Sequence, residues 1–384
     1  VLVLPDAGDR SVRGPEDAAV AGGVVEDGRE DGDGVALGLV GGDELAEQFA
    51  GEQRDVAVGD NDCSAELLLR VERVERIEGG FDGAARAGHL VLVDNQGGLL
   101  GLALHPDFEE NRWVYFAYSE GSSRANHTAL ARGRLSEDGS ALEGVEPLFR
   151  VNFDKQRGYH FGGRILFLDD CTLLLTLGEG AQYFQEAQNL DNHLGTIVRL
   201  NDDGSVPFDN PYVSADGAQP EIWSYGHRNV QGIARNPQTG AIWAHEHGPR
   251  GGDEINDIRP GLNYGWPAIT YGINYNGTPV SDARAAEGME QPLWYLVPSI
   301  APSGMAFYEG TEFAEWQGDL FVGALAGSML VRYEVDGDRI ISEEELLTER
   351  GDRIRDVQAG PDGHIYLLTD DLEGSVLRLD PVIP

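Results

Sequence analysis

A unit of two short apolar strands joined by a turn recurs along most of this chain, and it restricts the fold more than any other feature. The first strands of five units carry equivalent apolar residues, spaced 63, 68, 72 and 52 residues apart, at Leu102, Ile165, Ile233, Met305 and Val357. Strand pairs joined by turn-forming residues are typical of hairpins. Propeller blades of four strands repeat at roughly 40–50 residues, so these spacings indicate blades with loop insertions. The pattern favours a β-propeller, with function in loops near the central channel, over a β-sandwich of irregular hairpins.

The first 90 residues do not share this pattern. Residues 1–60 are rich in Gly, Ala, Val, Asp and Glu and contain one aromatic residue, Phe49. Residues 42–53 suit a helix, and residues 65–80 suit either a strand pair or an amphipathic helix. We therefore divide the chain into an unassigned N-terminal segment, 1–90, and a propeller domain, 91–384.

The chain of 384 residues carries 66 acidic and 28 basic side chains, a formal net charge of −38. A surface this acidic repels phosphates, which argues against a nucleic-acid partner. No run of about 18 apolar residues occurs, so we expect no membrane span. The opening residues lack the charged and apolar regions of a signal peptide. Cys63 and Cys171 match no metal motif, and a disulfide between them stays open.

The segment 221–267 concentrates polar side chains among glycines and prolines, which is typical of a binding site and unusual in a packed core. Within it, Arg228 offers a planar guanidinium to a carboxylate or an oxyanion, and Asn229 follows directly.

The same segment holds candidate metal ligands. The carboxylates of Asp253 and Glu254 and the carbonyls of the Gly248-Pro249 turn are hard oxygen ligands, which suit Ca²⁺. The histidines of HEHGP lack the spacing of a helical zinc protease.

Three further positions are candidates for chemistry. His160 lies between two aromatic residues and before two glycines, so it suits a general base, and the alternative is a structural histidine. Gln96 precedes paired glycines that allow close approach to a ligand, and the alternative is an ordinary turn. Arg353 and Arg355 alternate on a predicted strand, so they share a face and favour an anion between them. The alternative for these arginines is ion pairing with neighbouring aspartates.

Nine motifs together resemble the soluble quinoprotein aldose sugar dehydrogenases, a family that includes soluble glucose dehydrogenase and uses pyrroloquinoline quinone (PQQ). The resemblance runs from about Asn95 to Pro381. In order, the motifs are QGGLLGLALHPDF, HFGGRI, LGTIVRLNDDGSVPFDNPY, EIWSYGHRN followed by QG, EHGPRGGDEIN, LNYGWP, SGMAF, LFVGAL and RIRDVQAGPDG. The resemblance implies an all-β, six-bladed propeller with an atypical or incomplete first blade.

The resemblance also implies a role for each matching residue. His160 is the expected base for the C1 hydroxyl of the sugar, and Arg228 is expected near the reactive carbonyl of the quinone. The expected contacts of PQQ are Gln96, Arg228, Asn229, His247, Asp253, Ser299, Arg353 and Arg355. The expected Ca²⁺ ligands are the carbonyls of Gly248 and Pro249 at the cofactor, with Glu254 and the carbonyl of Tyr264 at a second, structural site. The implied reaction is PQQ-dependent oxidation of aldoses to lactones, with electrons passing to an external quinone, cytochrome or dye. The family implies a periplasmic or secreted location.

Three positions depart from the family. Ala326 stands where some relatives have a lysine that touches PQQ, and His247 stands where the glucose-specific enzyme has a glutamine. Residues 1–90 lack the first-blade motif of the relatives, so this segment is either a diverged blade or a non-native translation. Two alternatives remain at this stage, a Ca²⁺-dependent propeller hydrolase of the lactonase type and a non-catalytic glycan-binding propeller. The hydrolase would have no use for arginines placed to hold a tricarboxylate, and the binding propeller would need neither His160 nor the Gly-Pro metal turn.

Overall fold

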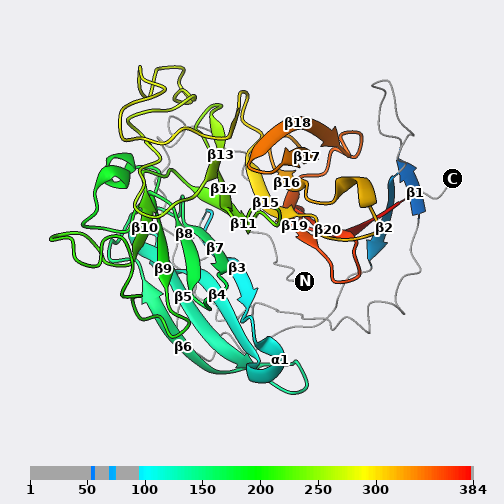
Figure 1. Cartoon of the computed structure of the whole chain (residues 1–384), viewed down its shortest axis with the longest axis horizontal. Coiled ribbons are helices and arrows are strands. Elements are labelled where there is room, and N and C mark those ends of the chain that lie inside the picture. Colours follow the sequence, from blue (N-terminus) through cyan, green and yellow to red (C-terminus); the bar gives the residue numbers. More distant parts are fainter. Residues whose placement is uncertain (1–52, 57–68, 75–94, 382–384) are drawn as a thin grey trace, which may run out of the picture.

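A computed structural model of the chain describes residues 53–56, 69–74 and 95–381. These residues form five antiparallel sheets. One inner strand from each sheet lies in the middle of the molecule, namely β3, β7, β11, β15 and β19 (Figure 1). The inner strands pack in chain order, β3 against β7, β7 against β11, β11 against β15 and β15 against β19. The arrangement is that of a β-propeller, as the sequence predicted.

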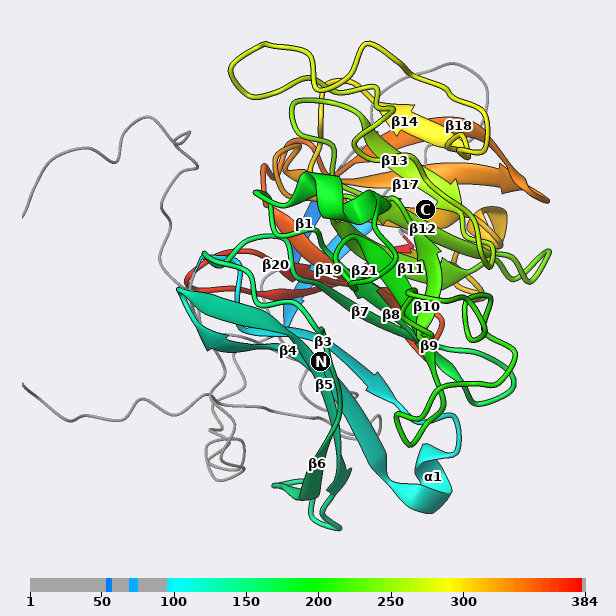
Figure 2. The same cartoon turned by 90° about the vertical axis from the view of Figure 1, so that its left-hand side faces the viewer.

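Two blades come from the first half of the propeller. The first consists of β3 (Leu99–Leu104), β4 (Trp113–Ser122), β5 (Ala125–Leu135) and β6 (Leu142–Arg150), with α1 (Phe108–Asn111) between β3 and β4. Its long strands run down to α1 in the side view (Figure 2). The second consists of β7 (Gly162–Phe167), β8 (Leu173–Leu177), β9 (Thr196–Leu200) and β10 (Ile222–Tyr225), with a 3-10 helix at Phe184–Gln188.

The next two blades follow the same plan. The third consists of β11 (Val230–Arg235), β12 (Ile242–Glu246), β13 (Asp253–Asp257) and β14 (Trp294–Leu296). The fourth consists of β15 (Pro302–Phe307), β16 (Leu320–Ala324), β17 (Met329–Asp336) and β18 (Arg339–Leu346), with a 3-10 helix at Ala314–Trp316.

The last sheet joins both ends of the propeller sequence. It orders β19 (Ile354–Ala359), β20 (Ile365–Thr369) and β21 (Val376–Pro381) before β2 (Leu69–Val74) and β1 (Gln53–Val56). Strand β2 pairs along the whole of β21, from Leu69 opposite Pro381 to Val74 opposite Val376. Residues 69–74 therefore form one strand, where the sequence predicted a strand pair or an amphipathic helix over 65–80; the rest of that range lies outside the described residues. The predicted helix at 42–53 lies outside the described residues, apart from Gln53 in β1.

The prediction of six blades is wrong for the described residues, which form five sheets. The sixth blade was expected before Asn95, and the described strands there, β1 and β2, join the last sheet and do not form one of their own. The division at residue 90 stays a prediction, because most of that segment lies outside the described residues. Among the residues described, no helix is long and apolar enough to span a membrane.

Apolar side chains fill the space between neighbouring blades and hold the inner strands in place. Trp243 on β12 is fully buried, and its ring packs edge-on against Phe307 of the next blade at 5.4 Å between centroids. Leu175 and Val198 of the second blade share a cluster with Tyr115 and Leu130 of the first. Truncating a buried Trp or Phe to Ala typically costs about 3–5 kcal/mol, so these contacts fix the blade-to-blade geometry.

Every inner strand begins with a β-bulge. The register shifts lie at Leu99/Gly101, Gly162/Ile165, Val230/Gly232, Pro302/Met305 and Ile354/Asp356. A bulge kinks a strand and redirects the side chains beside it. The backbone therefore bends at the start of each inner strand, and these bends lie at one end of the channel.

Candidate active site

The candidate residues meet because equivalent segments of successive blades converge. Residues that directly precede the inner strands include Gln96 before β3, His160 before β7, Arg228 before β11 and Arg353 before β19. The second strand of each blade is antiparallel to the first, so its end returns to the same place. The ends of β8, β12 and β20 accordingly add Glu179, His247 and Asp370 to the same end of the channel.

His160 and Glu179 form a buried pair. Nδ1 of His160 lies 2.8 Å from Oε1 of Glu179, and the two residues are 7 % and 1 % exposed. Burial and the charge of Arg228 lower the pKa of His160 below its ordinary value, although Glu179 acts in the opposite direction. The ring is therefore neutral at neutral pH. With Nδ1–H donated to Glu179, the lone pair of Nε2 remains for a proton.

Gln96 fixes the backbone at His160. Its Oε1 accepts the amide of His160 at 2.9 Å, and its own amide donates to the carbonyl of Gly158 at 2.8 Å. His160 has a φ of 47°, a left-handed conformation that a non-glycine residue keeps only when its surroundings hold it. Gln96 therefore acts on the candidate base by holding its backbone.

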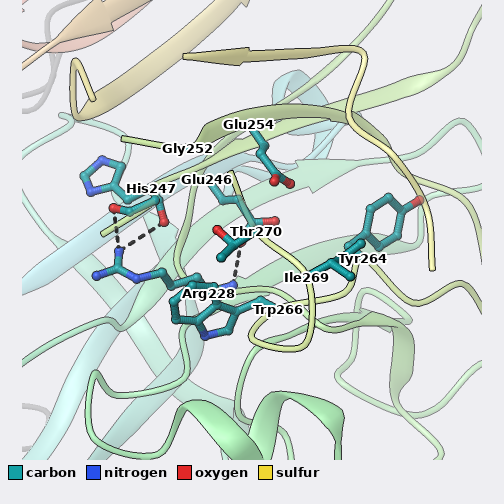
Figure 3. Close-up of a pocket in the computed structure, with 10 residues that line it drawn as sticks. Arg228, Glu246, His247, Gly252, Glu254, Tyr264, Trp266, Ile269 and Thr270 are labelled. Carbon is teal, nitrogen blue, oxygen red and sulfur yellow. Dashed lines mark hydrogen bonds between the residues drawn. The ribbon is translucent and has the colours of Figure 1, made fainter. Parts of the chain in front are cut away.

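Arg228 is a buried cation that lacks an anionic partner. It is 6 % exposed, and its guanidinium forms no ion pair with any carboxylate in the described part of the chain. Nη1 donates to the carbonyls of His247 and Gly248, both at 3.0 Å (Figure 3). A buried charge is costly unless an opposite charge compensates it, so this arrangement favours an anionic ligand. Arg199, equally buried in the second blade, instead pairs with Asp170 and Asp209.

Asn229 links the blades next to Arg228. Its Oδ1 accepts the amide of Gly162 at 3.2 Å and Nε2 of Gln231 at 3.1 Å, and its carbonyl accepts the amide of His247 at 3.2 Å. Among the described residues its Nδ2 has no hydrogen-bond partner, so that group can donate to a ligand.

Asp253 organises the Gly248-Pro249 turn from within. It is fully buried, and Oδ1 accepts the amide of Gly248 at 2.8 Å and the hydroxyl of Ser299 at 2.9 Å. Oδ2 accepts the amides of Ile300 and Ala301 at 2.8 and 3.2 Å. Burial raises the pKa of Asp253, although these hydrogen bonds act to lower it. Four donors occupy this carboxylate, and both Asp253 and Ser299 therefore shape the turn.

Glu246 and Glu254 face one another across β12 and β13. The two residues are directly paired in register, and they line one pocket with Tyr264 and Thr270 (Figure 3). Burial and the charge of Glu246 raise the pKa of Glu254 well above its ordinary value. The hydroxyl of Tyr264 donates to the carbonyl of Asp257 at 2.6 Å, so only its backbone carbonyl is left as a ligand. No group of three or more His, Cys, Asp and Glu side chains is placed to share a metal in the described residues.

His247 directly follows β12, at the channel end that also holds His160 and Arg228. Its Nε2 donates to the carbonyl of Pro302 at 2.6 Å. Burial lowers the pKa of His247 to about 3, with smaller contributions from Arg228 and His160. The ring is therefore a neutral wall of the site and not a second base near neutral pH.

Arg353, which directly precedes β19, and Arg355 on β19 share the carboxylate of Asp370, so an anionic group does lie between them. Arg353 contacts Oδ2 of Asp370 at 2.7 Å, and Arg355 contacts Oδ1 at 3.0 Å. Burial raises the pKa of Asp370, but the charges and hydrogen bonds of Arg355 and Arg353 outweigh burial and lower it overall. The partner is Asp370 and not Asp352 or Asp356, the neighbours considered from the sequence. The side chains of Arg353 and Arg355 are 48 % and 42 % exposed, so both cations remain accessible.

A family model described as Glucose / Sorbosone dehydrogenase matches residues 69–378. The chain belongs to the glucose/sorbosone dehydrogenase family. As a member of that family it is an oxidoreductase.

Characterised relatives agree with this membership. The chain is 46 % identical to aldose sugar dehydrogenase YliI of Escherichia coli over 294 residues, which cover 76 % of this chain and 79 % of YliI. The apo crystal structure of the E. coli aldose sugar dehydrogenase superposes with a TM-score of 0.76 at 42 % identity, covering 82 % of this chain and 93 % of that one. A PQQ-bound aldose sugar dehydrogenase from Streptomyces coelicolor gives 0.63 at 27 % identity, covering 86 % and 98 %. Membership in a dehydrogenase family does not favour the hydrolase or the non-catalytic alternative.

Sequence reasoning did not identify three carboxylates of the site in this glucose/sorbosone dehydrogenase family member, namely Glu179, Glu246 and Asp370. Each stands at or just after the end of a second strand, where it meets the start of an inner strand. The signal available was that shared position. A search for acidic residues directly after the second strand of each hairpin would have found all three.

Proposed function

We propose that this protein oxidises aldose sugars at C1 to lactones, with PQQ as cofactor and Ca²⁺ beside it. The observation that carries the proposal is the buried guanidinium of Arg228, which has no carboxylate partner in the described part of the chain and lies at the same channel end as the neutral His160. That combination supplies a base for a hydroxyl proton and a cation for an oxyanion.

The residues present fit PQQ, which carries three carboxylates and a quinone. Arg353, just before β19, and Arg355 on β19 offer exposed guanidinium groups, and Arg228 offers a buried one. Among the described residues, Nδ2 of Asn229 next to Arg228 has no hydrogen-bond partner, so it can donate to a ligand. Planar guanidinium groups bind carboxylates with two hydrogen bonds each, which suits such a ligand. Ala326 lies beside Leu325, whose carbonyl accepts Nη1 of Arg353 at 3.1 Å, so at this loop the arginine is the available cation.

The donor atoms also fit Ca²⁺, at two positions. The carbonyls of Gly248 and Pro249 lie on the turn that Asp253 braces, next to the guanidinium of Arg228. The second position lies between Glu246 and Glu254, whose crowded charges a divalent cation would neutralise. Carboxylate, carbonyl and hydroxyl oxygens are the ligands that Ca²⁺ prefers. Tyr264 and Thr270 line the same pocket, and each brings an oxygen ligand, a backbone carbonyl and a hydroxyl.

In the proposed reaction each residue of the site has one role. PQQ with Ca²⁺, when bound, supplies a quinone activated to accept a hydride. Nε2 of His160 takes the proton of the C1 hydroxyl, and Glu179 stabilises the imidazolium that results. Arg228, itself buried, offsets negative charge that develops near it. Gln96 and Asp253 hold the base and the metal turn in position.

The partners of the reaction belong to the same proposal. The substrate is an aldose, and the electrons leave to an external quinone, cytochrome or dye. The family resemblance supports a periplasmic or secreted location.

The test is reconstitution of the purified protein with PQQ and Ca²⁺, followed by dye reduction with a panel of aldoses. The proposal predicts turnover that requires PQQ and is abolished by a chelator. Folded protein that binds Ca²⁺ but oxidises no aldose would overturn it. Lactone hydrolysis, assayed in parallel, would then identify the hydrolase alternative.

A further inference from the structure

Lys155 is the only lysine of the chain, and it is buried beneath the candidate base. The residue is 1 % exposed. Its Nζ donates to Oδ1 of Asn126 at 3.0 Å and to the carbonyl of Tyr159 at 2.8 Å. The same nitrogen lies 3.1 Å from the centroid of the Phe161 ring, a position that stabilises an ammonium group. Buried lysines are rare unless they have partners, so this one calls for an explanation.

The contact with Tyr159 acts directly on His160. The carbonyl of Tyr159 and the amide of His160 belong to one peptide unit. Lys155 binds the carbonyl side of that unit at 2.8 Å, and Gln96 binds the amide side at 2.9 Å. A planar peptide held from both sides cannot rotate, and the left-handed φ of 47° at His160 depends on that restraint.

Asn126 provides the fixed point for this clamp. Asn126 is fully buried, and its backbone pairs with that of Lys155 through two hydrogen bonds of 2.9 Å. Its Nδ2 donates to the carbonyls of Ser122 and Arg157, at 2.9 and 3.1 Å. Strands β4 and β5 of the first blade therefore support the loop that carries His160 in the second.

Lys155 also lies close to the partner of the base. Its Cδ is 2.7 Å from where a Cβ on Gly180 would lie, and Gly180 directly follows Glu179. Burial lowers the pKa of Lys155 to about 7, and the charge of Glu179 acts to raise it. The positive charge of Lys155 in turn lowers the pKa of His160. The other charged or titratable groups that act on His160 are Glu179 and Arg228, and His247 interacts with it as well.

We propose that Lys155 is a positioning residue for His160, which locks the Tyr159–His160 peptide and places a positive charge beside the His160–Glu179 pair. This inference rests on the role of His160 in the proposed function. It assigns the only lysine of the chain to the reaction although it touches neither substrate nor cofactor.

The role can be measured without turnover. With ¹³C-labelled lysine, the protein gives one side-chain lysine signal, and we expect it to titrate near pH 7. Glu179→Gln should lower that pKa further, because the charge of Glu179 raises it. Arg199→Met is the matched control, since Arg199 is a buried cation over the Trp223 ring whose ion pairs lie away from the site. That variant should leave the lysine signal unchanged.

The second arm follows the His160 ring by NMR, with the signal identified by its loss in His160→Gln. Lys155→Met should raise the pKa of His160, and Lys155→Arg should restore the lower value by returning the charge. In the loaded enzyme, Lys155→Met should move the acid limb of kcat/KM to higher pH and lower kcat on the order of tenfold or more, as for a lost charge-assisted hydrogen bond.

Two results would overturn the inference. One is a lysine signal that titrates near its ordinary value and ignores Glu179→Gln. The other is an unchanged pKa of His160 in folded Lys155→Met. Because both readings come from the protein without cofactor, they stand apart from any failure of aldose oxidation, which would overturn the proposed function alone.

Discussion

Nδ1 of His160 lies 2.8 Å from Oε1 of Glu179, and both side chains are almost completely buried. This contact selects the tautomer with hydrogen on Nδ1, so the proton acceptor is Nε2. Oε2 of Glu179 has no hydrogen-bond partner among the described residues. The carboxylate is therefore committed to the imidazole.

Glu179→Gln should impair the reaction by presenting an amide where the carboxylate was. If the amide NH₂ faces Nδ1, the ring must carry its hydrogen on Nε2, and it then cannot accept a proton. We expect kcat to fall about 10²–10⁴-fold, the usual range for general base catalysis. The measurement is dye reduction at saturating PQQ. An unchanged kcat would show that Glu179 does not orient the base.

Arg355→Gln should weaken PQQ binding. A charge-assisted hydrogen bond contributes about 1.5–3 kcal/mol, so we expect the Kd for PQQ to rise about 10–100-fold while kcat at saturation changes little. Cofactor titration by fluorescence measures the Kd. Arg339→Gln is the control, because Arg339 is 70 % exposed and pairs only with Asp336 in the described residues. Equal effects of the two substitutions would contradict the assignment.

Asp253→Asn should loosen the Gly248-Pro249 turn and weaken the proposed binding of Ca²⁺ to it. Both carboxylate oxygens of Asp253 accept hydrogen bonds, four in all. In the asparagine variant an NH₂ group replaces one oxygen, so it faces at least one donor that it cannot satisfy. Each unsatisfied buried group costs about 1–3 kcal/mol. We expect a lower Tm and a smaller rise in Tm on adding Ca²⁺.

Asp319→Asn provides the comparison for this turn. Asp319 is similarly buried and accepts Nε of Arg332 and the amide of Val335, away from the metal turn. It should lower Tm while leaving the Ca²⁺ effect intact. Loss of the Ca²⁺ effect in both variants would indicate general unfolding instead.

Lys155 predicts a specific dependence of stability on pH. Its folded pKa of about 7 lies below 10.5, the ordinary pKa of a lysine, so between these values the unfolded chain binds more protons. The free energy of unfolding of the wild type, relative to Lys155→Met, is therefore highest above the unfolded pKa. It should fall by about 1.4 kcal/mol per pH unit as pH decreases toward 7. Denaturant titrations of both proteins between about pH 7 and 10 measure the difference, and a flat difference would refute the low pKa.

The sequence predicted much of the propeller because the repeat is local. Leu102, Ile165, Ile233, Met305 and Val357 all lie on the inner strands, as their equivalence required. The number of blades was wrong for the described residues, because the resemblance brought in a first blade where β1 and β2 instead extend the last sheet.

The sequence named candidate residues that the structure brings to one end of the channel, but it did not name the side chains that they contact. Arg353 and Arg355 share a face because strand geometry has a period of two, which a sequence reveals. That Asp370 binds them depends on the pairing of β19 with β20, and that Glu179 binds His160 depends on the turn at the end of β8. Such contacts are set by tertiary structure. The position of Glu179 and Asp370 just after a second strand indicates that they reach the channel end, but it does not identify the side chains that they bind.

The most direct test of the account is turnover by His160→Gln at saturating PQQ and Ca²⁺, with bound cofactor quantified in both proteins. The account predicts equal PQQ content and a kcat for aldose oxidation at least about 100-fold lower than that of the wild type. Equal cofactor content with an unchanged kcat would contradict the assignment of His160 as the base.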